Sequence, residues 1–198
     1  MKQYSLSLCA VLITLCSAPA IAQSPEAGRL LVANPSLSDP NFGQTVLLLL
    51  RHESDGSLAV ALNRPTWVNA AEAFPEIEAL ANYDEGLYFG GPIGIAQLLA
   101  VFESDEAAPD NALRLIDSIY VSPDLELLDG IDFSAATAPR VRIFAGHAEW
   151  GAGQLAQEIA SGSWRVLPAD AATIFAVDAA LLWDSLPRIG AAATAALR

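Results

Sequence analysis

The sequence predicts a single α/β domain in which a mixed β-sheet is covered by helices on both faces. Short apolar runs alternate along the chain with short helical patterns, which is typical of this class. Two of the runs flank an Asp-Gly turn, which indicates a hairpin and therefore an antiparallel pair within the sheet. The 198 residues are 53% hydrophobic, which is enough for one packed core and excludes a disordered chain.

The first 22 residues have the features of a secretory signal peptide. Lys2 gives a basic start, residues 6–16 are almost continuously apolar, and Ala20-Ile21-Ala22 is a typical cleavage pattern. The apolar run is too short to span a bilayer. We therefore expect cleavage after Ala22 and a periplasmic or secreted mature protein without a membrane span. A flexible lead-in over residues 23–27 should precede the domain of residues 28–198.

Removal of this segment changes the chemistry that the chain can perform. Cys9, Cys16 and Lys2 are the only cysteines and the only lysine, and all three precede Ala22. Nine arginines remain against 23 carboxylates, which leaves a formal charge of −14. Thiol nucleophiles, thiolate metal sites, disulfides and Schiff-base lysines are thereby excluded from the mature protein. The acidic charge also opposes binding to nucleic acid.

Apolar runs predict the strands in order along the chain. They lie at residues 30–33, 45–51, 58–63, 86–89, 97–102, 118–121, 140–145 and 164–167. The second and third form the hairpin around Asp55-Gly56, and their nearly continuous apolarity indicates burial on both faces. Gly90-Gly91-Pro92 predicts a tight turn between the fourth and fifth strands.

Helical spacing and capping residues predict the helices. Two short pieces are expected on either side of Pro75 within residues 69–81, and another begins after Ser122 as N-cap. Further helices are expected over residues 151–160, from the cap Asp170 through Phe175, and over residues 179–186.

Two histidines are the candidates for catalysis. His147 and Glu149 lie two residues apart immediately after the predicted strand of residues 140–145, and His52 is the only other histidine. Two histidines with carboxylates could hold zinc or iron only if the fold brings them together. Lone histidines more often lie at the surface or form structural hydrogen bonds, so we expect no metal and no cofactor. A hydrolase that uses His147 with Glu149, with or without a metal, is the alternative function.

Two glycine-rich segments are open to a functional and a structural interpretation. Gly90-Gly91 lacks the spacing of a phosphate-binding loop, which favours a turn. Gly151-Ala152-Gly153-Gln154 opens a predicted helix, where free N–H groups could hold an anion or a carbonyl beside Trp150. Small residues at this place also let a helix begin close to a sheet.

Several segments in a fixed order resemble the AlgH/YqgE family. They are Gly28 to Pro35, Asp39-Pro40 with Phe42, Leu62-Asn63-Arg64-Pro65, Phe89-Gly90-Gly91-Pro92, and Gly146 to Leu155. The resemblance implies a three-layer α/β/α-like domain and says little about activity. Some members of the family are named as transcriptional regulators, a role that the predicted export and the acidic charge disfavour here. Glu149 departs from the family pattern, in which we expect a small residue.

The resemblance also indicates a candidate groove. The matched positions that would line it are Asp39, Asn63, Arg64, Gly90, Gly91, His147, Trp150, Gly153 and Gln154. A structural role stands beside this interpretation, since Asp39 can cap a turn and Asn63 with Arg64 can end a strand. The leading prediction is an exported, non-enzymatic domain that binds an unknown protein or a small polar ligand, and no nucleic acid.

Overall fold

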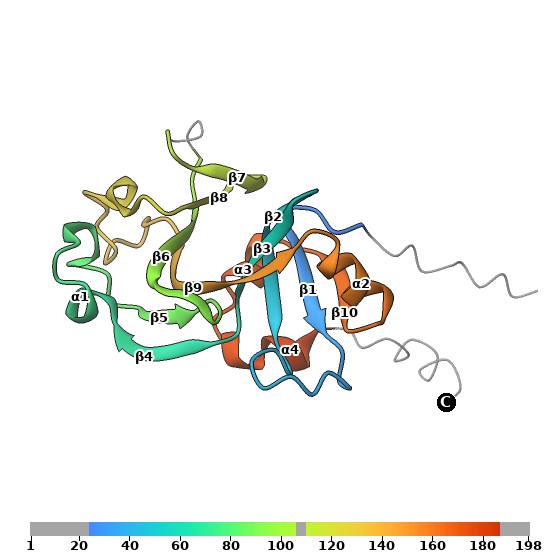
Figure 1. The fold of residues 1–198 in the computed structure, drawn as a ribbon. Coiled ribbons are helices and arrows are strands. Elements are labelled where there is room, and N and C mark those ends of the chain that lie inside the picture. Colours follow the sequence, from blue (N-terminus) through green and yellow to red (C-terminus); the bar gives the residue numbers. More distant parts are fainter. Residues whose placement is uncertain (1–23, 106–109, 187–198) are drawn as a thin grey trace, which may run out of the picture.

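The computed structural model describes residues 24–105 and 110–186, and the predicted signal peptide lies outside these residues. A curled sheet of ten strands dominates this part of the chain (Figure 1). The strands are β1 (Arg29–Ala33), β2 (Val46–Glu53), β3 (Gly56–Ala61), β4 (Pro65–Asn69), β5 (Gly86–Phe89), β6 (Ile93–Glu103), β7 (Leu113–Ile116), β8 (Ile119–Ser122), β9 (Val141–Gly151) and β10 (Trp164–Pro168).

The sheet runs in the order β10-β1-β2-β3-β9-β6-β8-β7, and β4 pairs with β5, which in turn pairs with β9. Every pair is antiparallel except β5 with β9, so the prediction of a mixed sheet is confirmed. One end of β9 pairs with β3 and the other with β5 and β6. This strand therefore joins the two parts of the sheet (Figure 1).

Two hydrophobic clusters form the core. The larger one gathers β1, β2, β3 and β10 with α2 (Gln154–Ala160) and α4 (Leu182–Ser185). The smaller one lies between β6, β8, β9 and the two 3₁₀ turns at Glu78–Leu80 and Leu125–Leu128. Val46 to Leu50 of β2 are all buried, which confirms the prediction that the hairpin is buried on both faces.

The helices are shorter than the sequence indicates. Besides α2 and α4, the described residues form α1 (Ala70–Ala73), α3 (Ala171–Ile174) and a 3₁₀ turn at Ala179–Leu181. The predicted three-layer arrangement is therefore not confirmed. α2 begins at Gln154 instead of residue 151, because β9 continues to Gly151 and Gly153 has a left-handed φ of 72°. No helix in the described part of the chain is long and apolar enough to cross a membrane.

The predicted cap lies two residues too early: Ser122 Oγ accepts from the N–H of Asp124 at 2.9 Å, but the 3₁₀ turn begins at Leu125 with Asp124 as its N-cap. Ser122 is the last residue of β8, where it pairs with Ala100, and Asp124 caps the following turn by accepting a hydrogen bond of 3.2 Å from the N–H of Glu126. The predicted cap Asp170 is confirmed, because its carboxylate accepts from the N–H of Thr173 at 2.7 Å.

The predicted strand end at residue 145 is also wrong, because β9 extends six residues further. His147 and Glu149 therefore lie within a strand and do not follow one. Ala148 and Trp150 are buried while Glu149 is exposed, which is the alternation of a strand with one face on the core. Gly146 and Gly151 flank residues 147–150, and because glycine is uncommon in strands the sequence does not predict that the strand continues here.

Candidate functional site

Asp39 caps the turn that follows β1. One of its carboxylate oxygens accepts hydrogen bonds from the N–H groups of Asn41 at 2.8 Å and Phe42 at 3.0 Å. The carboxylate is thereby used within its own turn, as the structural interpretation of this residue expects.

The side chains of Asn63 and Arg64 form hydrogen bonds with residues 43–46, which lead into β2. The Asn63 amide accepts from the N–H of Val46 at 2.9 Å and donates to the carbonyl of Gln44 at 2.9 Å. The Arg64 guanidinium donates to the carbonyl of Gly43 at 2.7 Å and to the hydroxyl of Thr45 at 2.9 Å. These side chains bind backbone groups and one hydroxyl of residues 43–46, so their polar atoms hold two distant segments together.

Gly90 and Gly91 pass directly against β9. A Cβ on Gly90 would lie 2.1 Å from the carbonyl oxygen of Gly146, and one on Gly91 would lie 2.3 Å from the carbonyl carbon of His147. The N–H of Gly90 already donates to the carbonyl of Ala145 at 2.9 Å. These glycines thus permit a close crossing of two backbones in the short connection between β5 and β6.

Trp150 and Gln154 meet at Glu158, a residue that the sequence did not single out as a partner. The Glu158 carboxylate accepts from the indole N–H of Trp150 at 3.0 Å, from that of Trp164 at 2.8 Å and from the Gln154 amide at 3.0 Å. Phe42 packs against both indoles, with ring centroids 6.4 Å and 6.0 Å away. This network holds α2 against β9 and β10.

Seven of the nine candidate groove residues fall into three groups, while Asp39 caps its own turn and Gly153 precedes α2. Asn63 and Arg64 fasten residues 43–46, Gly90 and Gly91 cross β9 beside His147, and Trp150 with Gln154 joins Glu158. None of the nine residues lines either of the two cavities described below. A common groove formed by all nine stays a prediction.

The histidines do not form a metal centre with the carboxylates in residues 24–105 and 110–186, where no three metal-ligating side chains are grouped. His52 Nδ1 lies 2.7 Å from Ser57 Oγ across the β2–β3 hairpin, but Ser57 is only 2% exposed. A buried hydroxyl of this kind cannot reach a substrate. His147 and Glu149 project from the same face of β9, and no hydrogen bond joins them in the described structure.

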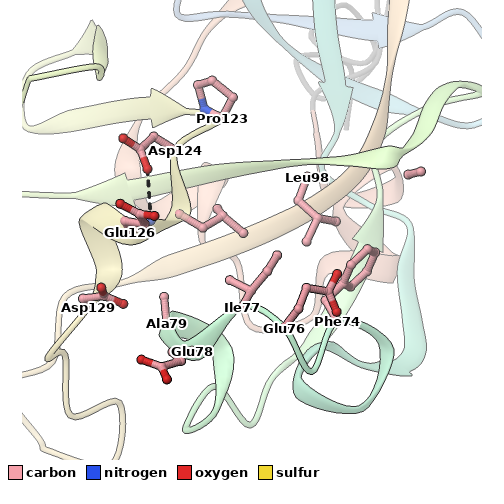
Figure 2. Close-up of a pocket in the computed structure, with 12 residues that line it drawn as sticks. Phe74, Glu76, Ile77, Glu78, Ala79, Leu98, Pro123, Asp124, Glu126 and Asp129 are labelled. Atoms are coloured by element: carbon pink, nitrogen blue, oxygen red, sulfur yellow. Dashed lines mark hydrogen bonds between the residues drawn. The ribbon is translucent and has the colours of Figure 1, made fainter.

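One cavity, of about 570 Å³, lies between the 3₁₀ turns at Glu78–Leu80 and Leu125–Leu128. We call it the acidic cavity. Figure 2 shows its apolar side chains, among them Phe74, Ile77 and Leu98, with carboxylates spread around them. The acidic residues are Glu76, Glu78, Asp124, Glu126 and Asp129. The carboxylates are too dispersed to ligate one metal ion and give a solvated, negatively charged recess.

A second cavity, of about 540 Å³, lies where β4 and β5 meet the start of β9 and the chain that follows α3. We call it the Arg142 cavity. Aromatic side chains and charges of both signs line it. These residues are Tyr83, Tyr88, Phe133 and Phe175, with Asp84, Glu85, Arg140 and Arg142.

Arg142 is a buried cation at this site. It is 4% exposed, and its guanidinium donates to the carbonyls of Ile174 at 2.6 Å and Ala176 at 2.5 Å. The Tyr88 ring lies 4.6 Å from its central carbon. No carboxylate in the described residues lies within 4.0 Å of it, whereas a buried charge normally has an oppositely charged partner.

Burial perturbs the titratable groups around this cation. It lowers the pKa of Arg142 and raises those of the Tyr83 and Tyr88 hydroxyls. Partial burial raises the pKa of the Glu85 carboxyl, and the charge of Arg142 partly offsets that rise. Perturbed groups that converge on a cavity mark a functional site more often than isolated charges do.

The Arg142 cavity was not predicted from the sequence, although one signal for it was present. Arg142 interrupts the apolar run Val141-Arg142-Ile143-Phe144, and an arginine is unusual among the core residues of a strand. The aromatic residues come from distant segments, so only the fold brings them together.

Comparisons with known proteins extend over most of the chain. A family model described as AlgH-like matches residues 30–191. The UPF0301 protein of Streptomyces coelicolor is 37% identical over 166 residues, which cover 81% of this chain and 84% of that protein. The UPF0301 protein of Chlorobaculum tepidum is 34% identical and covers 79% and 82%, respectively.

Two solved structures share the fold. The crystal structure of protein DIP2367 from Corynebacterium diphtheriae matches with a TM-score of 0.66 and 30% identity, and covers 81% of this chain and 85% of that one. The solution structure of the AlgH protein from Pseudomonas aeruginosa matches with a TM-score of 0.62 and 26% identity, and covers 83% and 93%.

Proposed function

The chain belongs to the AlgH-like family, and from this premise we propose that it is a non-enzymatic binding protein whose ligand site is the Arg142 cavity. The observation that carries the proposal is that Arg142, which lines this cavity, is buried and has no carboxylate partner within the described residues. Burial of a cation is unfavourable unless an anion or several dipoles surround it. An anionic group of a ligand would complete its surroundings.

The size and walls of the cavity support this proposal. Its volume of about 540 Å³ lies within the range of about 300–1,000 Å³ that is common for small-molecule sites. Tyr83, Tyr88 and Phe175 supply rigid apolar area, and the hydrogen bonds from Arg142 to two backbone carbonyls fix the charge in place. Pre-organisation of this kind lowers the entropic cost of binding.

The site can be tested before its ligand is identified. Small carboxylates and neutral fragments would be screened against the ¹⁵N-labelled protein by NMR. We expect shift changes at residues 83–88, 140–142 and 175–177, with carboxylates giving the larger changes. Changes confined to the acidic cavity or to the surface around His147, or no response to any fragment, would refute the assignment.

Export is the second part of the proposal. The basic start, the short apolar run and the Ala20-Ile21-Ala22 pattern support it. Cell fractionation and N-terminal sequencing test it: a periplasmic or secreted chain that begins at Gln23 is expected. A cytoplasmic protein that retains residues 1–22 would contradict export and leave the ligand site unaffected.

A further inference from the structure

The charges of the Arg142 cavity are arranged by depth. Arg142 is buried, whereas Asp84 and Glu85 are exposed residues on the segment that leads into β5. The second cation, Arg140, is already neutralised, because Glu103 accepts from its Nε and from one terminal nitrogen at 2.9 Å each. Among the described residues, one inner positive charge and two outer negative charges therefore lack an ion-pair partner and can act on a ligand.

The inner cation retains donors for a ligand. Its two bonds to backbone carbonyls use one N–H from each terminal nitrogen, out of the five N–H groups of a guanidinium. Every fully buried side-chain nitrogen and oxygen in the described residues has a partner, and Nε of Arg142 has none. Nε is therefore not fully buried, and Arg142 is among the residues that line the cavity.

The outer carboxylates face the same space without reaching Arg142. No ion pair within 4.0 Å joins Arg142 to Asp84 or Glu85 in the described residues, yet Glu85 and Arg142 each alter the pKa of the other. Two opposite charges that line one cavity and do not touch leave room for a molecule between them. A ligand with both charges would satisfy the two sites at once, whereas a simple anion would meet repulsion at the rim.

Most of the remaining side chains that line the cavity are apolar or aromatic. Phe133 and Phe175 line the cavity with Tyr83 and Tyr88, and Val177 at its edge is 97% exposed. Such surfaces favour an apolar or aromatic substituent. We infer that the ligand of the Arg142 cavity is a zwitterionic α-amino acid with an apolar side chain, its carboxylate on Arg142 and its ammonium group on Glu85. This inference rests on the proposed binding function.

Three probes that differ by one charged group test the inference by calorimetry on the intact protein. They are L-phenylalanine, 3-phenylpropionate, which lacks the ammonium group, and phenethylamine, which lacks the carboxylate. We expect L-phenylalanine to bind at least about tenfold more tightly than either analogue, because each analogue loses one charge-assisted contact.

Variants separate the two ends of the ligand. Glu85→Gln, at an exposed position, should lower the affinity for L-phenylalanine about tenfold and leave that for 3-phenylpropionate equal or higher. Arg142→Gln should remove binding of both, provided that circular dichroism shows a folded protein. Glu76→Gln, which removes a carboxylate from the acidic cavity, is the matched control and should change nothing.

The outcomes distinguish this inference from the proposed function. Equal affinities for L-phenylalanine and 3-phenylpropionate that do not respond to Glu85→Gln would show an anion site, which overturns the zwitterion and retains the cavity as a ligand site. Preferred binding of phenethylamine, or no binding of any probe at millimolar concentration, would also overturn the zwitterion. The fragment screen would still decide whether the Arg142 cavity binds ligands.

Discussion

At the scale of single residues, one carbonyl oxygen excludes every side chain from position 90. A Cβ there would lie 2.1 Å from the backbone oxygen of Gly146, and β5, which ends one residue earlier, is paired with β9 on the adjacent residues. We expect Gly90→Ala to lower the free energy of unfolding by about 3 kcal/mol or more, measured by urea denaturation with tryptophan fluorescence.

Gly151→Ala is the matched control for this change. No atom lies within 4 Å of a Cβ at Gly151, and its φ is not positive. Its free energy of unfolding should stay within about 1 kcal/mol of that of the parent. Equal stability of the two variants would show that the close crossing at Gly90 is not required.

Glu158 is the second residue with a sharply defined role. Glu158→Ala would leave the buried indole N–H groups of Trp150 and Trp164 without an acceptor. Because each unsatisfied buried donor costs about 1–3 kcal/mol, we expect a loss of about 2–4 kcal/mol in urea denaturation.

Glu149→Ala removes the same charge from the same region and serves as the control. Glu149 is exposed on β9, so its replacement should change stability by no more than about 0.5 kcal/mol. A loss at Glu149→Ala as large as that at Glu158→Ala would assign the effect to net charge and contradict the network.

At the scale of elements, the cap of α3 gives stability that depends on pH. Hydrogen bonds from the hydroxyl and the N–H of Thr173 lower the pKa of Asp170 below its ordinary value of 3.8. A carboxyl with a lowered pKa in the folded state stabilises the fold above the unfolded pKa, and this contribution is lost as the pH falls through the folded pKa.

We therefore expect Asp170→Ala to cost about 1 kcal/mol at neutral pH and progressively less below about pH 4. Urea denaturation at both pH values measures this difference. Asp178→Ala is the control, since Asp178 precedes the 3₁₀ turn at Ala179–Leu181 and its side chain makes no capping bond. A cost for Asp170→Ala that is the same at both pH values would contradict the mechanism.

Strands with mostly buried side chains could be predicted from the sequence, whereas strands with mostly exposed side chains could not. The apolar runs of β1, β2, β3 and β5 were visible because most residues of the first three strands and both central residues of β5 are buried. β4 and β7 were missed because exposed residues dominate them, including the fully exposed Trp67. A strand held mainly by pairing with its neighbour leaves little apolar pattern in the sequence.

The same distinction applies to the candidate site. Asp39 and Asp170 act within a few residues of themselves, so local sequence predicted their roles. Asn63 binds residues 17 and 19 positions away, and Arg142 binds carbonyls 32 and 34 positions away. Such partners follow from topology, and no spacing rule in a single sequence gives them.

At the scale of the whole molecule, a formal charge of −13 opposes binding to another polyanion. We expect no binding to a labelled DNA duplex of about 30 base pairs at about 150 mM salt, measured by fluorescence anisotropy. Titration at low salt is the control for weak contacts. Micromolar affinity that falls steeply with salt would contradict this prediction and support a regulatory role on DNA.

The central position of β9 in the sheet has a consequence for biosynthesis. The ribosome releases residues 29–122, which include eight of the ten strands, before the strand that joins them. Until Val141–Gly151 emerges, the β2–β3 hairpin presents an unpaired edge, and β1 waits still longer for β10. Such non-local pairing gives a high contact order, so the sheet completes its assembly only after translation is nearly finished. We therefore expect the nascent chain to expose the edges of β3 and β1 until β9 and β10 are available.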